Sequence, residues 1–296
     1  MKKLLVFALV LGSQAAAREL TSLYVVPAAA NKPGVLGTDW HTDLTLVNPH
    51  EFSLPVFLQF LPSNRDNSGG VPTVTFELYP FETLNLWDVL GPKGFAARGN
   101  TGALLVGADT ERIACSAQSH NCDFAVFSRT YTVGPLPGEF GQALPGFPAN
   151  LGMDASVLAY LPQVIHDSDF RTNLGVASLA SKWVEVGVDV QGHDGRILRR
   201  TSTWVPPFGH VQWALDTTVT GGSVVFYLKS GPRDAMLFPY ASVVNQRTGD
   251  PVYVEAQMTV VGVSAQGFGG RATVVPGREL PPRQPAPAFE LVRRGR

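Results

Sequence analysis

Residue types that commonly perform catalysis are sparse in this chain and widely separated. The histidines are His41, His50, His120, His166, His193 and His210. None stands in the His-x3-His or His-Glu-x2-His spacing that places zinc ligands on one helix face. No Gly-x-Ser-x-Gly turn presents a serine nucleophile, and no glycine-rich phosphate loop occurs between a strand and a helix. The sequence therefore predicts no catalytic residue, no metal site and no cofactor, although a triad assembled from distant residues stays open.

The cysteine content offers one candidate site. Cys115 and Cys122 are the two cysteines of the chain, and His120 lies between them. Three ligands in Cys-x4-His-x-Cys spacing fall short of the four that a structural zinc normally takes. In an exported protein two such cysteines usually pair, so we expect a disulfide. The short loop it closes predicts a stabilisation of about 2–3 kcal/mol in the chain-entropy model.

Asp39 and Asp169 occupy matching positions, each directly before an aromatic residue. A calcium site is one interpretation, because the nearby segment Asp66-Asn67-Ser68 offers further oxygen ligands. An aspartate before a strand more commonly accepts hydrogen bonds from turn N–H groups. We therefore expect both residues to cap turns.

Aromatic side chains raise the question of ligand stacking. The five tryptophans are Trp40, Trp87, Trp183, Trp204 and Trp213. Trp40 and Trp213 match the apolar residues Phe170 and Leu86 elsewhere in the chain, which favours core packing. Trp183 stands at the start of an expected strand and Trp204 near the end of the next, where exposed aromatics suit a ligand or a partner. These two are the candidate ligand-facing aromatics.

The elements that position these residues are expected to be short strands. Val184, Val186, Val188 and Val190 alternate with Glu185, Gly187 and Asp189, the period of a half-buried strand. The Asp194-Gly195 turn between 184–190 and 196–205 predicts a hairpin. Glycine (30) and proline (23) are abundant and no long amphipathic helix is evident. This pattern predicts an all-β fold of antiparallel, immunoglobulin-like β-sandwich type.

An internal repeat predicts the domain organisation. Thr38–Leu44 (TDWHTDL) is similar to Ser168–Leu174 (SDFRTNL), and further matches follow in the same order. The offset falls from 130 at Asp39/Asp169 to 127 at Pro80/Pro207 and 120 at Gly102/Gly222. We expect tandem β-sandwich copies at residues 18–148 and 149–266, the first carrying longer loops at Asn64–Gly70 and around the cysteines.

The two ends of the chain are expected to lie outside these copies. Lys2 and Lys3, an apolar run to Leu11 and the small-residue site ending at Ala17 have the form of a Sec-type signal peptide over residues 1–17. Export would leave the protein soluble in the periplasm or outside the cell, with no transmembrane anchor. Residues 267–296, rich in proline and arginine, are expected to form a disordered tail.

Three segments carry a resemblance to a known kind of protein: Thr38–Pro49, Phe127–Tyr131 and Val244–Tyr253. They are similar to a tandem β-sandwich-like repeat of uncharacterised secreted bacterial proteins, over roughly residues 22 to 262. The resemblance implies architecture and compartment, and it carries no established activity and no site residues. The segment that contains the cysteines departs from the repeat pattern.

Charge and motif content leave an interaction module as the leading hypothesis. The formal net charge of −1 gives no field that would attract nucleic acid. We expect a non-enzymatic, exported structural or interaction module whose loops or open sheet edge meet an unknown protein or an envelope glycan. The alternatives are a carbohydrate-binding module that uses exposed aromatics and, less favoured, an enzyme with a non-local active site.

Overall fold

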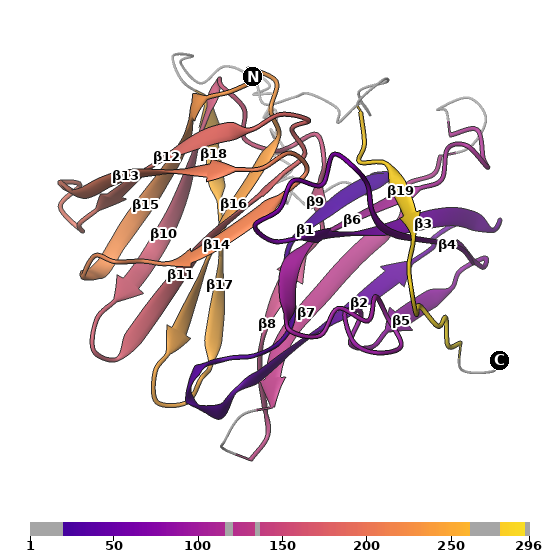
Figure 1. The fold of residues 1–296 in the computed structure, drawn as a ribbon, viewed down its shortest axis with the longest axis horizontal. Coiled ribbons are helices and arrows are strands. Elements are labelled where there is room, and N and C mark those ends of the chain that lie inside the picture. The colour runs from indigo at the N-terminus through magenta and orange to yellow at the C-terminus, as the bar shows by residue number, and fades with distance from the viewer. Residues whose placement is uncertain (1–19, 116–120, 134–136, 261–278, 294–296) are drawn as a thin grey trace, which may run out of the picture.

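The computed structural model describes residues 20–115, 121–133, 137–260 and 279–293. The fold over these residues is all-β and built from antiparallel sheets that pack as sandwiches, which confirms the predicted class (Figure 1). The expected signal peptide, residues 1–17, lies outside the described residues. We call residues 20–148 the first half and residues 149–260 the second half.

The first half contains two layers of strands. Their bounds are β1 (Leu23–Pro33), β2 (Asp39–Val47), β3 (Leu54–Pro62), β4 (Val71–Leu78), β5 (Thr83–Leu86), β6 (Asn100–Ala108), β7 (Ala125–Val133), β8 (Glu139–Pro145) and β9 (Phe147–Pro148), with a 3-10 turn at Val35–Gly37. One layer has the order β4-β3-β6-β1-β9 and the other β5-β2-β7-β8. The end of β1 also pairs with the start of β2, which joins the layers at one corner.

The second half repeats this strand order. Its strands are β10 (Val157–His166), β11 (Phe170–Ser178), β12 (Val184–Gln191), β13 (Ile197–Val205), β14 (His210–Ala214), β15 (Val219–Ser230), β16 (Leu237–Asn245), β17 (Pro251–Glu255) and β18 (Gln257–Val260). The layers are β13-β12-β15-β10-β18 and β14-β11-β16-β17. Each strand of the first half thus has a counterpart nine strands later, β4 in β13 and β1 in β10.

The two halves also share an irregularity in their first strand. The register of β1 against β6 shifts between Val26 and Ala29, and that of β10 against β15 shifts between Leu161 and Val164. A proline, which cannot donate to the ladder, lies inside each shift, Pro27 in one half and Pro162 in the other.

In both halves the strand opposite the register shift carries a glycine, because a side chain there would clash with a backbone carbonyl oxygen of the neighbouring strand. A Cβ at Gly102 would lie 2.2 Å from the carbonyl oxygen of Leu61, and one at Gly222 would lie 2.1 Å from that of Gln191. These matches place Gly102 with Gly222 and Leu61 with Gln191, and they fix the correspondence of the neighbouring residues.

In each half an aromatic residue faces a glycine on the neighbouring strand, but the strand that carries the aromatic residue differs between the halves. Phe57 on β3 faces Gly107 on β6, and its ring lies 2.5 Å from where a Cβ of that glycine would be. In the second half Gly187 on β12 faces Tyr227 on β15, with the ring 2.2 Å from the glycine's Cβ position. Each ring therefore fills the space left by a glycine directly opposite.

Alternation of apolar residues produces one core in each half. Val184, Val186, Val188 and Val190 are fully buried in the second core, as the predicted period of two requires. The first core is built around Leu44, Leu58, Leu104 and Phe124. The described part of the chain thus buries two separate sandwich interiors.

A third apolar cluster joins the halves to each other. It combines the outer face of β1, β3 and β6 with the second half, and its members are Val25, Phe57, Leu61, Val71, Ala103, Leu105, Phe147, Ala149, Ala177, Leu179 and Phe238. The outer face of this sheet in the first half is therefore buried by the second half.

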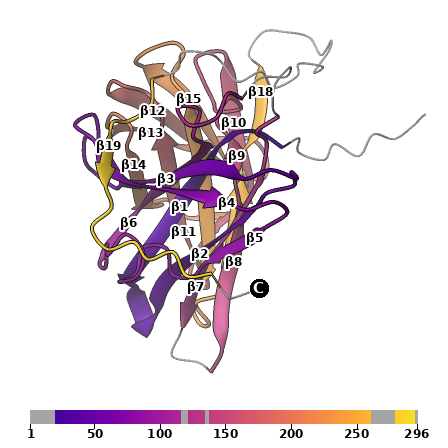
Figure 2. The same ribbon diagram turned by 90° about the vertical axis from the view of Figure 1, so that its right-hand side faces the viewer.

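The end of the chain packs on the first half, which corrects part of the expected disordered tail at 267–296. β19 (Arg283–Pro285) pairs in parallel with the outer edge of β4 (Figures 1 and 2). Arg283 forms an ion pair with the buried Asp109 at 3.1 Å, and the ring of Phe289 packs edge-on against Phe95 at 5.3 Å. Residues 267–278 of the expected tail lie outside the described residues. Composition alone does not indicate the strand, because its partners lie about 200 residues away in the chain.

Exchanging the glycine and the ring tests the correspondence between the halves. We expect Gly187→Phe alone to lower the free energy of unfolding by about 1–3 kcal/mol, because the new ring meets Tyr227 in a packed site. Tyr227→Gly in the same chain should recover part of that loss by restoring the arrangement of Phe57 and Gly107. Urea unfolding of the single and double variants measures this, and strictly additive losses would contradict it.

Candidate functional site

An open sheet edge on the second half is the clearest candidate for a binding surface. β13 is the last strand of its sheet and, among the described residues, pairs with β12 alone (Figure 1). Its counterpart β4 carries β19 along the same edge, with Arg283, Gln284 and Pro285 opposite Val71–Thr73. The edge that is occupied in the first half is thus open in the described part of the second.

The side chains around this edge differ in charge between the halves. In the first half Asp109, whose side chain is 2% exposed, accepts two hydrogen bonds from Arg283, at 3.1 and 3.2 Å. The Arg283 guanidinium also stacks on the Phe57 ring at 4.8 Å. By the register that pairs Gly102 with Gly222, the counterpart of Asp109 is Lys229. An arginine arriving at β13 would meet a like charge there.

Lys229 retains capacity for a further acidic partner. Its ammonium donates to the Glu185 carboxylate at 2.7 Å and reaches the Ser202 hydroxyl at 3.4 Å. Hydrogen bonds from Lys229 and Ser202 hold the pKa of Glu185 below its usual range. An ammonium has three donors, and the Lys229 side chain is 50% exposed, so one donor remains directed to solvent.

Trp183 and Trp204, the candidate ligand-facing aromatics, lie beside this edge. Their exposed fractions are 50% and 52%. Trp204 stands opposite Glu185, and Trp183 is two residues before Glu185, so the register places all three on the outer face of the sheet. Arg200 on the same face pairs with Asp189 through two hydrogen bonds, which raise the pKa of the arginine. We call Trp183, Glu185, Asp189, Arg200, Ser202, Trp204 and Lys229 the β12–β13 face.

The other matched tryptophans divide between two environments. Trp213 packs against the second core, as expected. The sequence places Trp40 in the core as well, and this is corrected by the structure, in which it lines a cavity between the halves. The match of Trp40 with Phe170 in the sequence identifies equivalent strand positions. It does not reveal that residues of the second half lie next to Trp40.

A histidine and a hydroxyl meet inside the interface between the halves. The imidazole Nδ1 of His210 lies 2.6 Å from the Ser63 hydroxyl, and its Nε2 lies 2.9 Å from the Tyr240 hydroxyl, which donates to Gln212 at 2.8 Å. His210 is 1% exposed, and burial lowers its pKa to about 3. A histidine with so low a pKa is a weak base, and it would accept the Ser63 proton poorly near neutral pH. The residue that orients the imidazole is a tyrosine where a Ser-His-Asp triad has a carboxylate.

The repeated aspartates do not cap turns, which corrects the expectation from sequence. Asp39 lies 3.5 Å from His41 and 3.7 Å from Arg98, and Asp169 accepts a hydrogen bond from Arg247 at 2.7 Å. In the second half the cap is Asp167, which accepts from two backbone N–H groups. The repeated position therefore serves ion pairing at the rim of each sandwich.

The loop at Asn64–Gly70 connects the halves. Asp66 accepts two hydrogen bonds from Ser68, which hold the pKa of its carboxyl below the usual range. Asn67 is buried and donates to the carbonyl oxygens of Pro62 and Phe208. Of the oxygen atoms proposed as calcium ligands, those of Asp66 and Ser68 thus bond to each other, while the Asn67 Oδ1 is buried without a hydrogen-bond partner among the described residues. Within the described ranges, no group of three His, Cys, Asp or Glu residues is placed to hold a metal ion.

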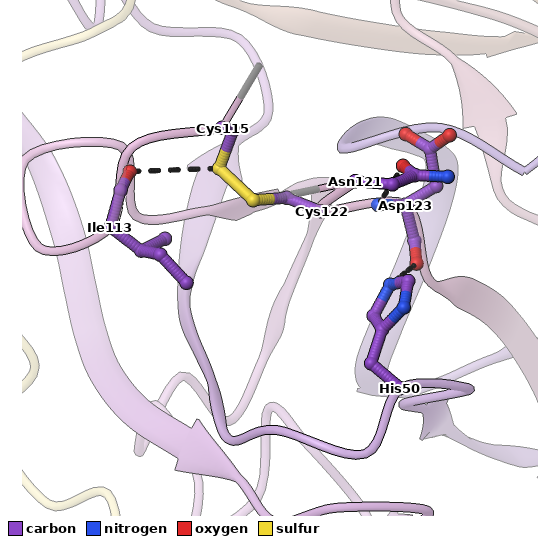
Figure 3. The surroundings of a disulfide bond; sticks show 6 residues. All are labelled: His50, Ile113, Cys115, Asn121, Cys122 and Asp123. Atoms are coloured by element: carbon purple, nitrogen blue, oxygen red, sulfur yellow. Dashed lines mark hydrogen bonds between the residues drawn. A yellow bond between two sulfur atoms is a disulfide. The ribbon is translucent and has the colours of Figure 1, made fainter. Parts of the chain in front are cut away.

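The predicted disulfide is present between Cys115 and Cys122, with Cα atoms 5.5 Å apart (Figure 3). Cys122 is buried in the first core, and the imidazole of the adjacent His50 lies 2.7 Å from the Asp123 carbonyl oxygen. His120 lies outside the described residues. Over the described ranges, no helix is long and apolar enough to span a membrane.

Comparison with protein-family models and with curated proteins finds no significant match to this chain.

The buried histidine makes a specific prediction about pH. Because the pKa of His210 is about 3 in the fold and about 6.5 in an unfolded chain, protons bind the unfolded state preferentially between these values. Stability is therefore lost as the pH falls from 6.5 towards 3, by about 1.4 kcal/mol per unit. Urea unfolding at pH 6.5 and 5.0 should show a loss that is about 2 kcal/mol larger in the wild type than in His210→Gln. Equal losses in the two proteins would contradict the assignment.

Proposed function

We propose that this chain is a non-enzymatic, exported interaction module of the bacterial cell envelope or exterior, and that it receives an extended segment of a partner protein along β13. The observation that carries this proposal is β19, which pairs with the matching edge of β4 in the same molecule. The fold thus already contains one example of the strand addition that we propose for the second half.

Backbone pairing supplies the affinity in this kind of recognition, and side chains beside the edge supply the specificity. The outer edge of β13 carries backbone N–H and C=O groups that its sheet leaves unpaired within the described residues. The β12–β13 face adds tryptophan and arginine, the residue types that contribute most at protein interfaces. An arriving strand would gain both kinds of contact.

Charge defines the chemistry of the partner segment. Where β19 brings Arg283 to Asp109, a strand on β13 meets Lys229 and the exposed Arg200. We infer that the partner segment carries an aspartate or glutamate at the position that Arg283 occupies in β19. The C-terminal segment of a second copy, which carries the arginine, is disfavoured at β13 for the same reason.

Synthetic peptides with the sequence of residues 279–293 test this proposal on the full chain. We expect the peptide with Arg283→Glu to bind and to slow hydrogen exchange at residues 198–203, and the unchanged peptide to bind at least tenfold more weakly. Lys229→Asp in the protein should reverse this preference, because it restores the charge of Asp109.

Three outcomes would contradict strand addition at β13. They are unchanged exchange at 198–203 with both peptides, equal affinities, and a preference that Lys229→Asp does not alter. Protection at residues 71–73 instead would mean that the peptide displaces β19 from β4.

A carbohydrate-binding function is the second candidate, favoured by the exposure of Trp183 and Trp204 beside charged hydrogen-bonding groups. Sugars stack on such indole faces while charged groups bind their hydroxyls. On a glycan array, Trp204→Ala should abolish the signals of the wild type, whereas Trp87→Ala, which removes an exposed tryptophan of the first half, should retain them. An array without wild-type signals would exclude this candidate.

A further inference from the structure

A cavity of about 300 Å³ lies between the two halves, separate from the β12–β13 face. The first half contributes the end of β1, Trp40 on β2 and Gln142 on β8, and the second half contributes β11, β14 and β16. This volume is at the lower end of the range of small-molecule sites.

Strand register directs polar side chains into this cavity. Arg171 and Asn173 on β11 face Val244 and Ser242 on β16, and the residues between them, such as Thr172, are buried on the opposite side. Alternation therefore places the arginine and the asparagine on the face that meets the first half.

Arg171 is half-buried and lacks a partner among the described residues. In that part of the chain its side chain makes no hydrogen bond or ion pair, and burial alone lowers the pKa of its guanidinium. Other arginines that leave solvent in this fold are paired, Arg283 with Asp109 and Arg293 with Glu82. Partial desolvation of an unpaired cation is costly, so the position calls for an explanation.

Four of the side chains that line the cavity offer hydrogen-bond donors that are still available. Lys32 and Arg171 both line it, and no aspartate or glutamate is among the described residues of its lining. The amide oxygen of Gln212 accepts from Tyr240, and that of Gln142 accepts from Ser242 at 3.0 Å, which leaves the NH2 group of each amide available. The cavity is therefore positively charged and suited to a ligand rich in acceptor oxygens.

We propose that this cavity binds a sugar acid, a small molecule with one carboxylate and several hydroxyl groups. The carboxylate would lie on the guanidinium of Arg171, which presents two parallel N–H donors in the geometry that a carboxylate accepts. Amide NH2 groups of Gln142 and Gln212 would donate to hydroxyl oxygens, and the half-buried Trp40 offers an indole to the sugar ring. The site is independent of strand addition at β13.

Calorimetric titration of the full chain with D-glucuronate and with D-glucose tests the proposal, because the two probes differ in the carboxylate. We expect glucuronate to bind at least tenfold more tightly than glucose. Arg171→Gln should abolish this preference, and Arg171→Lys should restore part of it, because lysine keeps the charge without the fork. Arg199→Gln removes an exposed arginine outside the cavity and should leave the affinity unchanged.

Stability without ligand gives a second readout. Removing an unpaired, partly desolvated cation should raise the thermal midpoint of Arg171→Gln above that of the wild type, which also shows that the variant folds. The absence of saturable glucuronate binding at millimolar concentrations, equal affinity for glucose, or unchanged binding by Arg171→Gln would each overturn the proposal. Binding of an oligomeric uronate more tightly than of monomeric glucuronate, with the same dependence on Arg171, would identify the end of an acidic polysaccharide as the source of the sugar acid.

Discussion

The packing of the two halves against each other is the constraint on which the rest of the structure depends. The outer face of β1, β3 and β6 would be an exposed apolar surface in an isolated first half, and Ala177, Leu179 and Phe238 cover it. Next to this cluster, the hydrogen bond between Ser63 and His210 crosses from one half to the other, and Tyr240 bonds to the other imidazole nitrogen. Together they fix the relative position of the sheets and thereby create the cavity at Arg171.

Equivalent strands in the two halves have different surroundings, and these differences are where function is to be sought. β4 is covered by β19, whereas β13 has an open edge over the described residues. The face around Phe57 is buried by the second half together with Leu280 and Arg283 of the C-terminal segment, while the β12–β13 face carries half-exposed tryptophans and paired charges. The same strand order therefore carries a buried apolar face in one half and an exposed polar face in the other, because the outward-facing side chains differ between the halves.

The buried charged groups also differ in whether the protein itself supplies a partner for them. Asp109 and Arg283 satisfy each other in a buried pair that holds the C-terminal segment in place. Arg171 has no such partner in the described part of the chain, although it is partly removed from water. A group that costs stability without a compensating contact in the protein is the kind of feature that a ligand can compensate.

The sequence by itself determined the strands, their alternation and the pairing of Cys115 with Cys122, because these follow from local periodicity and from the chemistry of the residues. It also indicated the matching positions, such as Gly102 and Gly222, where close backbone approach excludes a side chain. Only the tertiary structure decided that Asp39 pairs with His41 and Arg98, that residues 283–285 form a strand on β4, and that Trp40 and Arg171 meet at one cavity. Most of those contacts join residues that are far apart in the chain, so neither composition nor periodicity encodes them locally.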